Sequence, residues 1–483
     1  MSKSELAILG GQAVRRKPFV VEPMVDEEEE RFVLAAIREK SFSRYVGSTS
    51  QDIEAILRVT SAEAAAIEDD WHFLGGPNVR AFSAEFAKFF HVPYAIPINS
   101  ATSGIGVALA AAGVGPGDEV IVPAISFTAT ASAVLMFNAV PVFVDVDPQM
   151  FCLDPAQVEK AITPQTRAII PVHLAGNVAD MGAILAIAKR HRLKVIEDAA
   201  QAIGACWDGR KAGTLGDAGV FSFQQSKNIM TGEGGMIVTH DQEIARRSRL
   251  ILNHGEVVFD ERHGVDDLAN IVGLNLRMPE LCAAVGRAQL KKLEAVNGWR
   301  TRNADLLRAE LAGLPGLRLP PSQRQSSGPA REVPHMLVVL HDAHAMGISR
   351  GLFVAAMRAE GVPVGTGYTR PLYANPTFLQ KVAYGREGCP WTCQRYKGSV
   401  TYARGQCQVA ERLLDQEFLW FYHIAYPSTE EDMRDIGRAV RKVVEARQEL
   451  SLVAPALTER IGPASQGRLT GTTQTVHRLR NGR

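Results

Sequence analysis

Short apolar runs alternate with helical segments through the middle of the chain. The segment 181–191 shows the helical periodicity, with apolar residues three and four positions apart. β-Branched runs that alternate with helices predict a mainly parallel sheet with helices on both faces. We therefore expect an α/β domain over residues 76–299. Its predicted strands lie at residues 119–124, 140–146, 167–174, 194–198, 218–223 and 235–239.

The parts of the chain that flank this domain have different patterns. An N-terminal segment, residues 1–75, contains a helix-like insert at 47–74. Residues 287–312 predict one long helix or two helices, which lead into a smaller α+β domain at 300–448. Within the smaller domain we expect a strand at 332–340 and a charged amphipathic helix at 430–448.

Charge and hydropathy exclude several classes of partner. The 53 Lys and Arg residues nearly balance 52 Asp and Glu residues, so the formal net charge is only +1. This balance argues against nucleic acid or an anionic membrane as the main partner. We find neither a run of about 18 apolar residues nor a signal-peptide pattern, so we expect no membrane span and a cytoplasmic protein. Residues 449–483, rich in Arg, Ser, Thr and Gly, predict a disordered basic tail.

The cysteine pattern allows two interpretations. The chain has six cysteines, which are expected to be free thiols in a long cytoplasmic protein. Cys389 and Cys393, with Cys407, have a spacing compatible with zinc ligands, and His423 is a candidate fourth ligand. We favour free thiols and expect no metal, because no fourth ligand stands at a matching spacing.

Chemically distinctive residues stand at the carboxyl ends of the predicted strands. Ligands collect at this edge of a parallel sheet, so these residues are site candidates. They are Phe127, His173, Asp198 and Ser222. His173 could hydrogen-bond a substrate hydroxyl or be a core histidine, and the sequence leaves both readings open.

Lys227 is the strongest candidate for a nucleophile. It follows the strand-like run Phe221–Phe223 and precedes a glycine-rich stretch, TGEGG. Desolvation in such a setting lowers the pKa of a lysine and makes its neutral amine available for a Schiff base. Taken alone, Lys227 would be read as a surface lysine in a turn.

Three further features give Lys227 a chemical context. Asp198 could pair with a protonated pyridine nitrogen, although it could also cap a helix. The small residues at 99–104 open a helix and predict an anion site, to which Ser222 could add a hydroxyl. Phe127 could lie flat on an aromatic ring or belong to the core. The combination describes a pocket for pyridoxal 5'-phosphate (PLP).

Several motifs make the chain similar to a known family, the PLP-dependent sugar aminotransferases of the DegT/StrS type. This family has the fold type I architecture of aspartate aminotransferase, with a mainly parallel central sheet, helices on both faces and a smaller α+β C-terminal domain. The resemblance covers most of the chain outside the insert and the tail. The motifs are GPNV at 76–79, GPGDEV at 115–120, PVHLAG at 171–176, EDAAQ at 197–201, FSFQQSK at 221–227, GEGG at 232–235 and GLNLRM at 273–278.

The resemblance implies a role for each matching residue. Lys227 matches the Schiff-base lysine, and Asp198 matches the partner of the pyridine nitrogen. Gln201 matches the residue beside the phenolic oxygen of the cofactor, and Phe127 the ring-stacking aromatic. The family is a homodimer with shared active sites, so the resemblance implies the same for this chain. The residues that match the phosphate site are Ala101, Thr102, Ser222 and, reaching the neighbouring subunit, Asn253.

The function implied is transfer of an amino group from L-glutamine or L-glutamate to a keto-cyclitol or keto-sugar. The segment 389–393, with Tyr402 and 408–413, resembles the cyclitol branch of the family. Arg277 and Arg370 are available cations for a substrate, or else structural ion-pair partners. One alternative is a PLP-dependent sugar dehydratase of the same family, which carries His where Lys227 stands. The other is a catalytically inert regulator that senses a small molecule.

Overall fold

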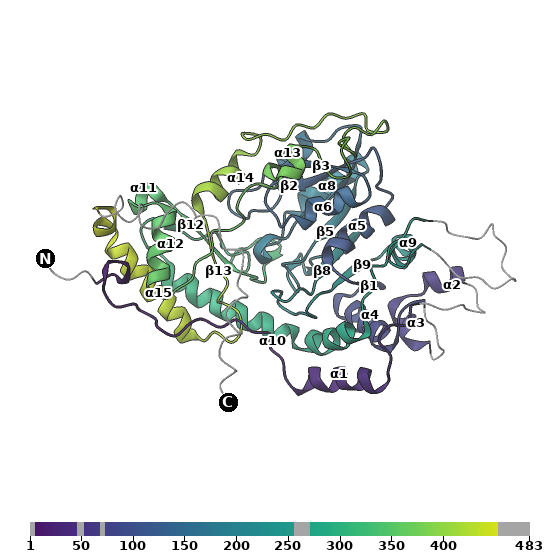
Figure 1. Cartoon of the computed structure of the whole chain (residues 1–483), viewed down its shortest axis with the longest axis horizontal. Helices are drawn as coiled ribbons and strands as arrows, with labels where there is room; N and C mark the ends of the chain where they lie inside the picture. The colour runs from purple at the N-terminus through teal and green to yellow at the C-terminus, as the bar shows by residue number, and fades with distance from the viewer. Residues whose placement is uncertain (1–4, 46–52, 68–72, 256–270, 453–483) are drawn as a thin grey trace.

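A seven-stranded sheet forms the centre of the large domain, in agreement with the predicted α/β class (Figure 1). The computed structural model describes residues 5–45, 53–67, 73–255 and 271–452. Strands β8, β5, β4, β2 and β3 are parallel, and β9 runs antiparallel between β8 and β1. In spatial order the strands are β1 (Tyr94–Ile98), β9 (Gly235–Thr239), β8 (Ala218–Ser222), β5 (Lys194–Asp198), β4 (Thr166–Ile169), β2 (Glu119–Pro123) and β3 (Val140–Val144).

The six predicted strands all form, and the sheet adds β1, which the sequence analysis missed. The run YAIPI of β1 contains Pro97, which cannot donate to a strand ladder and therefore weakens a strand prediction. The structure places β1 at the edge of the sheet, where it pairs with β9 alone and the missing N–H is tolerated.

Helices pack against the sheet and bury its apolar side chains. The helix α5 (Ala101–Ala111) contacts β8 and β9 closely, because Gly104 lies where a Cβ atom would come within 2.7 Å of Val220 Cγ1. The predicted helix 181–191 is α8, with the same bounds. The other helices of this domain are α4 (Pro77–Phe90), α6 (Ala129–Met136), α7 (Pro155–Lys160), α8 (Met181–His191) and α9 (Gln242–Leu252), with the 3-10 turn η2 (Leu174–Gly176).

A single helix, α10 (Glu280–Leu311), joins the two domains and resolves the choice between one helix and two. Its Ala283 and Leu293 belong to the large core, whereas Leu307 and Leu311 belong to the small core. Figure 1 shows it running from beneath α4 towards α15. Among the described residues no helix, α10 included, is both long and apolar enough to cross a membrane.

The small domain has its own hydrophobic core. A three-stranded antiparallel sheet packs with helices, and the N-terminal residue Leu6 is fully buried among them. The predicted strand 332–340 is realised from residue 337 on, and the predicted helix 430–448 is realised as α15. The elements are β10 (Leu317–Arg318), β12 (Leu337–His341), β13 (Phe418–Phe421), η1 (Ala7–Leu9), α11 (Ala343–Met346), α12 (Arg350–Ala359) and α15 (Glu430–Glu445).

Residues 372–414 lie in sequence between the small-domain elements α12 and β13 but pack on the large core. Tyr396 donates a hydrogen bond to the buried carboxylate of Glu119 at 2.7 Å, and Tyr402 donates to the Pro141 carbonyl at 2.7 Å. Aromatic side chains of this segment are thus buried in the large core. Figure 1 shows the backbone of the segment passing beside β2 and β3. The expected small domain at 300–448 is therefore not one continuous packing unit. The segment contains η4 (Leu372–Ala374), α13 (Pro376–Leu379), α14 (Gln408–Arg412) and the π-helical turn η5 (Leu413–Glu417).

The helical insert is present as two short helices, α2 (Ile53–Arg58) and α3 (Ser61–Ala66). Ser61 Oγ accepts a hydrogen bond from the Ala95 amide at 2.8 Å, which attaches α3 to β1. The remainder of the predicted insert, at 47–52 and 68–72, and the predicted tail from residue 453 on lie outside the described residues. The remaining elements are α1 (Glu27–Arg38), which packs on α10, and a small sheet of β6 (Cys206–Trp207), β7 (Arg210–Lys211) and β11 (Ala330–Arg331).

Candidate active site

Asp198 is a buried carboxylate at the end of β5. Its side chain accepts a hydrogen bond from Thr130 Oγ1 at 2.7 Å and one from the Ala200 amide at 3.2 Å. Thr130, fully buried on α6, is in turn 2.7 Å from the Ser126 hydroxyl. The sequence analysis missed Thr130, because its position in a run of small residues carries no local signal of a contact with β5.

The neighbouring residue, Glu197, serves the fold instead of the site. Its carboxylate accepts hydrogen bonds from the amides of Gly213 at 2.8 Å, Leu215 at 2.6 Å and Gly216 at 2.7 Å. His173 Nε2 lies 2.9 Å from the same carboxylate, and His173 Nδ1 accepts from the Ala179 amide at 3.2 Å. Both ring nitrogens of this fully buried histidine are therefore engaged within the fold. Of the two readings that the sequence left open, His173 has the geometry of the core histidine.

Lys227 stands in a hairpin-like turn between β8 and β9. The turn is closed by backbone hydrogen bonds from Phe223 to Gly234 at 2.9 Å and from Gln225 to Gly232 at 2.9 Å. Burial lowers the pKa of Lys227 to about 8, although the negative charge of Asp198 acts in the opposite direction. The structure therefore brings Lys227 and Asp198 close enough to interact electrostatically, and it leaves roughly a tenth of the amine neutral at pH 7.

Gln201 lies beside Asp198 and connects it to the far end of the chain. Its side-chain oxygen accepts from the Ala175 amide at 2.9 Å, and its amide nitrogen donates to the Tyr368 hydroxyl at 2.8 Å. Burial raises the pKa of Tyr368 to about 12, so its hydroxyl keeps its proton. Tyr368 escaped the sequence analysis because it is more than 160 residues from Gln201 and belongs to no motif.

The start of α5 and the end of β8 lie close together where the sequence predicts an anion site. Ser222 pairs with Gly235 across β8 and β9, and a Cβ atom on Gly235 would lie 2.8 Å from the Ala101 nitrogen. The glycine thus allows the N-terminus of α5 to lie directly against the sheet. Ser100 caps the helix by accepting from the Ser103 amide at 3.1 Å, and Thr102 is exposed. Helix N–H groups and hydroxyls are what a phosphate requires.

Phe127 and Arg370 present exposed side chains. Phe127, in the connection from β2 to α6, is 64% exposed, which is unusual for a large aromatic ring and excludes the core alternative. Arg370 is exposed and lies two residues beyond Tyr368, so it is available to a ligand.

Asn253 and Arg277 lie together at the end of α9. Arg277 donates to the Asn253 side-chain oxygen at 2.8 Å, and the Asn253 amide nitrogen donates to the Tyr45 carbonyl at 3.2 Å. The two residues therefore hold each other in place, and the hydrogen-bond partner of the Arg277 guanidinium within the described ranges is the amide of Asn253 and not a carboxylate.

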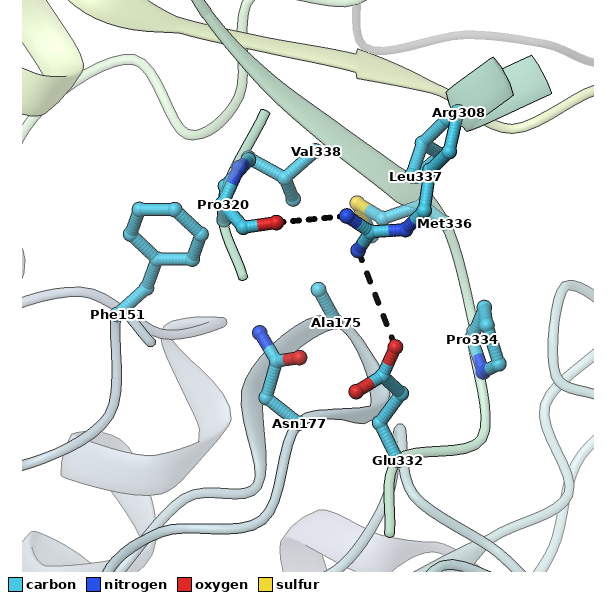
Figure 2. A pocket seen from close by; sticks show the side chains of 10 residues that line it. All are labelled: Phe151, Ala175, Asn177, Arg308, Pro320, Glu332, Pro334, Met336, Leu337 and Val338. Atoms are coloured by element: carbon cyan, nitrogen blue, oxygen red, sulfur yellow. Dashed lines mark hydrogen bonds and ion pairs between the residues drawn. The ribbon is translucent and has the colours of Figure 1, made fainter. Parts of the chain in front are cut away.

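A pocket lies at the seam between the two cores (Figure 2). Phe151, Ala175 and Asn177 face the small domain there, and Arg308 and Glu332 approach each other within 3.8 Å. None of the predicted site residues lines this pocket. As for the cysteines, the described part of the chain contains no group of three or more His, Cys, Asp or Glu residues that could hold a metal ion.

The architecture defines a class of protein. A mostly parallel seven-stranded sheet, with a buried aspartate ending β5 and a lysine turn after β8, is the fold type I aminotransferase arrangement. The chain belongs to the DegT/DnrJ/EryC1/StrS aminotransferase family, whose model matches residues 57–420. The family resemblance that the motifs indicated is therefore confirmed, and the chain is an enzyme of an aminotransferase family.

Relatives of known description support this assignment. The chain is 38% identical over 409 residues to L-glutamine:2-deoxy-scyllo-inosose aminotransferase of Streptoalloteichus tenebrarius, covering 82% of this chain and 93% of the relative. It is 40% identical over 378 residues to L-glutamine:scyllo-inosose aminotransferase of Streptomyces griseus, covering 77% and 87%. Among solved structures, an aminotransferase from Psychrobacter cryohalolentis superimposes with a TM-score of 0.74 at 28% identity, covering 89% of this chain and all of that one.

Proposed function

We propose that this enzyme transfers the amino group of L-glutamine to the ring ketone of an inosose-type cyclitol, with PLP as cofactor. L-Glutamate is the alternative donor, and a keto-sugar is the alternative acceptor. The observation that carries the chemistry is the juxtaposition of Asp198 and Lys227 at the ends of the neighbouring strands β5 and β8. The activities for which the relatives are named, with L-glutamine as donor and scyllo-inosose-type ketones as acceptors, support the choice of donor and acceptor.

The residues present fit PLP. The approach of β9 to the start of α5 leaves no room for a Cβ atom at Gly235, so the N-terminus of α5 lies directly against the residue that pairs with Ser222. In this proposal Ala101, Thr102 and Ser222 hold the phosphate, and Phe127 covers the ring with its exposed face. Asp198 holds the ring nitrogen, and Gln201 lies beside the phenolic oxygen.

When bound, PLP supplies an electron sink for the carbanion that forms at the donor carbon. Asp198 keeps a positive charge at the ring nitrogen through a charge-assisted hydrogen bond in a water-poor site. The neutral Lys227 amine takes a proton from the α-carbon of the donor. In the second half-reaction the same group returns a proton to the carbon that was the ring ketone of the acceptor. Arg370 is available for the donor carboxylate.

The working unit in this proposal is a homodimer with shared sites. Beside Asn253, the side chains of Val272 and Leu274 are 81% and 41% exposed, which favours a surface that a second copy covers. Asn253 would complete the phosphate site of that copy. Mixing inactive Lys227→Ala and Asn253→Asp proteins tests this, because subunit exchange leaves one site intact. Recovered activity supports sharing, whereas a monomer by light scattering at working concentration contradicts it.

The test of the reaction itself uses its two halves. Protein loaded with PLP is mixed with glutamine or glutamate, and conversion of the cofactor to its amine form is followed by absorption. Inososes, nucleotide-linked keto-sugars and α-keto acids are then supplied to reverse the conversion. No conversion with any amino acid would refute the aminotransferase proposal, and reversal by α-keto acids alone would refute the cyclitol acceptor.

A further inference from the structure

Arg300 is a buried cation near the Lys227 turn. It lies on α10 and is 3% exposed. Its guanidinium donates to the His335 carbonyl at 2.7 Å and to the Tyr422 hydroxyl at 3.4 Å, while its Nε atom has no hydrogen-bond partner among the described residues. Within this described part of the chain no carboxylate forms an ion pair with it. Burying an unpaired charge is costly, so its retention calls for a reason.

The two residues that accept hydrogen bonds from Arg300 both contact the Lys227 turn through their side chains. The Tyr422 hydroxyl donates to the carbonyl of Ser226, the residue before Lys227. His335 Nδ1 lies 3.2 Å from the side-chain oxygen of Asn228, the residue after Lys227. Arg300 is therefore connected to Ser226 through Tyr422 and to Asn228 through His335.

The connection is reinforced by ring contacts and by α10. The Arg300 guanidinium lies over the Tyr422 ring, 5.2 Å from its centre, and the His335 and Tyr422 rings meet edge to face at 5.4 Å. Asn228 also donates to Asn297, one turn earlier on α10, at 2.9 Å. The Lys227 turn is thus held by α10 and by residues that flank the small-domain strands β12 and β13.

We propose that Arg300 is a positioning residue for Lys227: it fixes the turn through Tyr422 and His335, and its permanent positive charge favours the neutral form of the lysine amine. This inference rests on the proposed catalytic role of Lys227. It gives the buried, unpaired guanidinium a function, because a cation that stabilised only the fold would be better placed beside a carboxylate.

The charges around Lys227 oppose one another. The negative charge of Asp198 favours the protonated amine, whereas Arg300 favours the neutral amine. Burial, together with the charges of Lys227 and Arg300, lowers the pKa of His335 well below its usual value, so this histidine adds no charge. Among the described residues, the titratable and charged groups about the turn include Glu233 within the turn itself, Asp198 from β5, Arg300 from α10, His335 ahead of β12 and Tyr422 after β13.

The test is a pH titration of full-length protein loaded with PLP, followed by the visible absorption of the bound cofactor. Arg300→Gln should raise the midpoint by about one pH unit, because removing a nearby positive charge favours the protonated nitrogen. Arg300→Lys keeps the charge and should keep the midpoint close to that of the wild type. Arg308→Gln is the matched control, since it removes a charge from the same helix about 12 Å further along, where Glu332 approaches it.

A separate variant tests whether Tyr422 fixes the Lys227 turn. Tyr422→Phe retains the charge of Arg300 but loses the hydrogen bond to Ser226, so the midpoint should stay while amide hydrogen exchange in residues 223–234 becomes faster. Unchanged exchange in that turn would overturn the positioning role.

The charge argument fails if folded Arg300→Gln keeps the wild-type midpoint, or if Arg300→Lys shifts as far as a neutral variant. Should Arg300→Gln not fold, Arg300→Met supplies the neutral variant, and a wild-type midpoint in folded Arg300→Met overturns the charge argument. Lys227→Ala separates this inference from the proposed function. If the visible absorption of the bound cofactor still titrates in Lys227→Ala, the role of Lys227 itself is refuted. If it no longer titrates in Lys227→Ala but keeps the wild-type midpoint in Arg300→Gln, only the inference about Arg300 is refuted.

Discussion

Asp198 is held by its own strand and by the adjacent helix α6, whereas Lys227 stands in a turn held by distant parts of the chain. The contacts of Asp198 come from Thr130 and Ala200, all within the large domain. The turn of Lys227 is contacted by Tyr422 and His335, which flank strands of the small domain. The difference indicates that Asp198 is fixed with the sheet, while the position of Lys227, the proposed base, depends on how the two domains meet.

The largest effect is expected at Lys227. Lys227→Ala should lower the rate of amino transfer by at least about 10³-fold, because no other group at this position can move the proton. The fold should survive, since the variant removes a desolvated amine. Single-turnover conversion with glutamine measures the loss, and Lys189→Ala, on the exposed face of α8, is the control. Retained turnover in Lys227→Ala would contradict the assignment.

The second largest effect is expected at Asp198, which ends strand β5. Asp198→Asn preserves the shape and an acceptor for Thr130 but removes the negative charge, so transfer should slow by about 10²–10³-fold. Cofactor binding should be largely kept, because the phosphate contacts are unaffected. Equal half-reaction rates in Asp198→Asn and wild type would show that the carboxylate charge does not contribute.

A smaller effect is expected where α6 supports Asp198. Thr130→Val removes the 2.7 Å hydrogen bond at nearly constant volume. A hydrogen bond to a charged group contributes about 1.5 kcal/mol or more, which corresponds to roughly a tenfold slower reaction. Thr130→Ser keeps the hydroxyl and should react close to the wild-type rate. If Val and Ser variants behaved alike, packing and not the hydrogen bond would be the contribution of Thr130.

The smallest effect is the pH dependence of stability in the cofactor-free protein. Burial lowers the pKa of Lys227 to about 8 from an ordinary value of 10.5. Between these values the unfolded chain still binds the proton that the folded chain has released, so the free energy of unfolding rises with pH. Urea denaturation should therefore show wild type gaining stability relative to Lys227→Ala as pH rises through this window. A difference that stays constant with pH would mean that the amine is not desolvated.

Most of the large domain was predictable because its signals are local. Runs of β-branched residues fixed the positions of the six predicted strands, and the periodicity at 181–191 gave the bounds of α8. The motifs EDAAQ and FSFQQSK sufficed to single out Asp198 and Lys227. The edge strand β1 escaped because one proline outweighs the surrounding apolar residues in a local reading.

Other features depended on contacts between residues far apart in sequence. An aromatic residue such as Tyr396 is apolar enough for either core, and only its hydrogen bond to Glu119 decides that residues 372–414 pack on the large one. His173 had two readings until Glu197 and Ala179 were found to occupy its two nitrogens.

The amino-acid sequence by itself determined six of the seven strands, the class of chemistry and the choice of Asp198 and Lys227 as candidates, because strand propensity, turn chemistry and motif spacing act over a few positions. Only the tertiary structure decided what holds those residues: Thr130 under Asp198, Tyr368 on Gln201, and Arg300 with Tyr422 behind Lys227. These partners are brought together by burial of two hydrophobic cores. The local sequence shows that a side chain is apolar enough to be buried, but not which distant side chain it will contact.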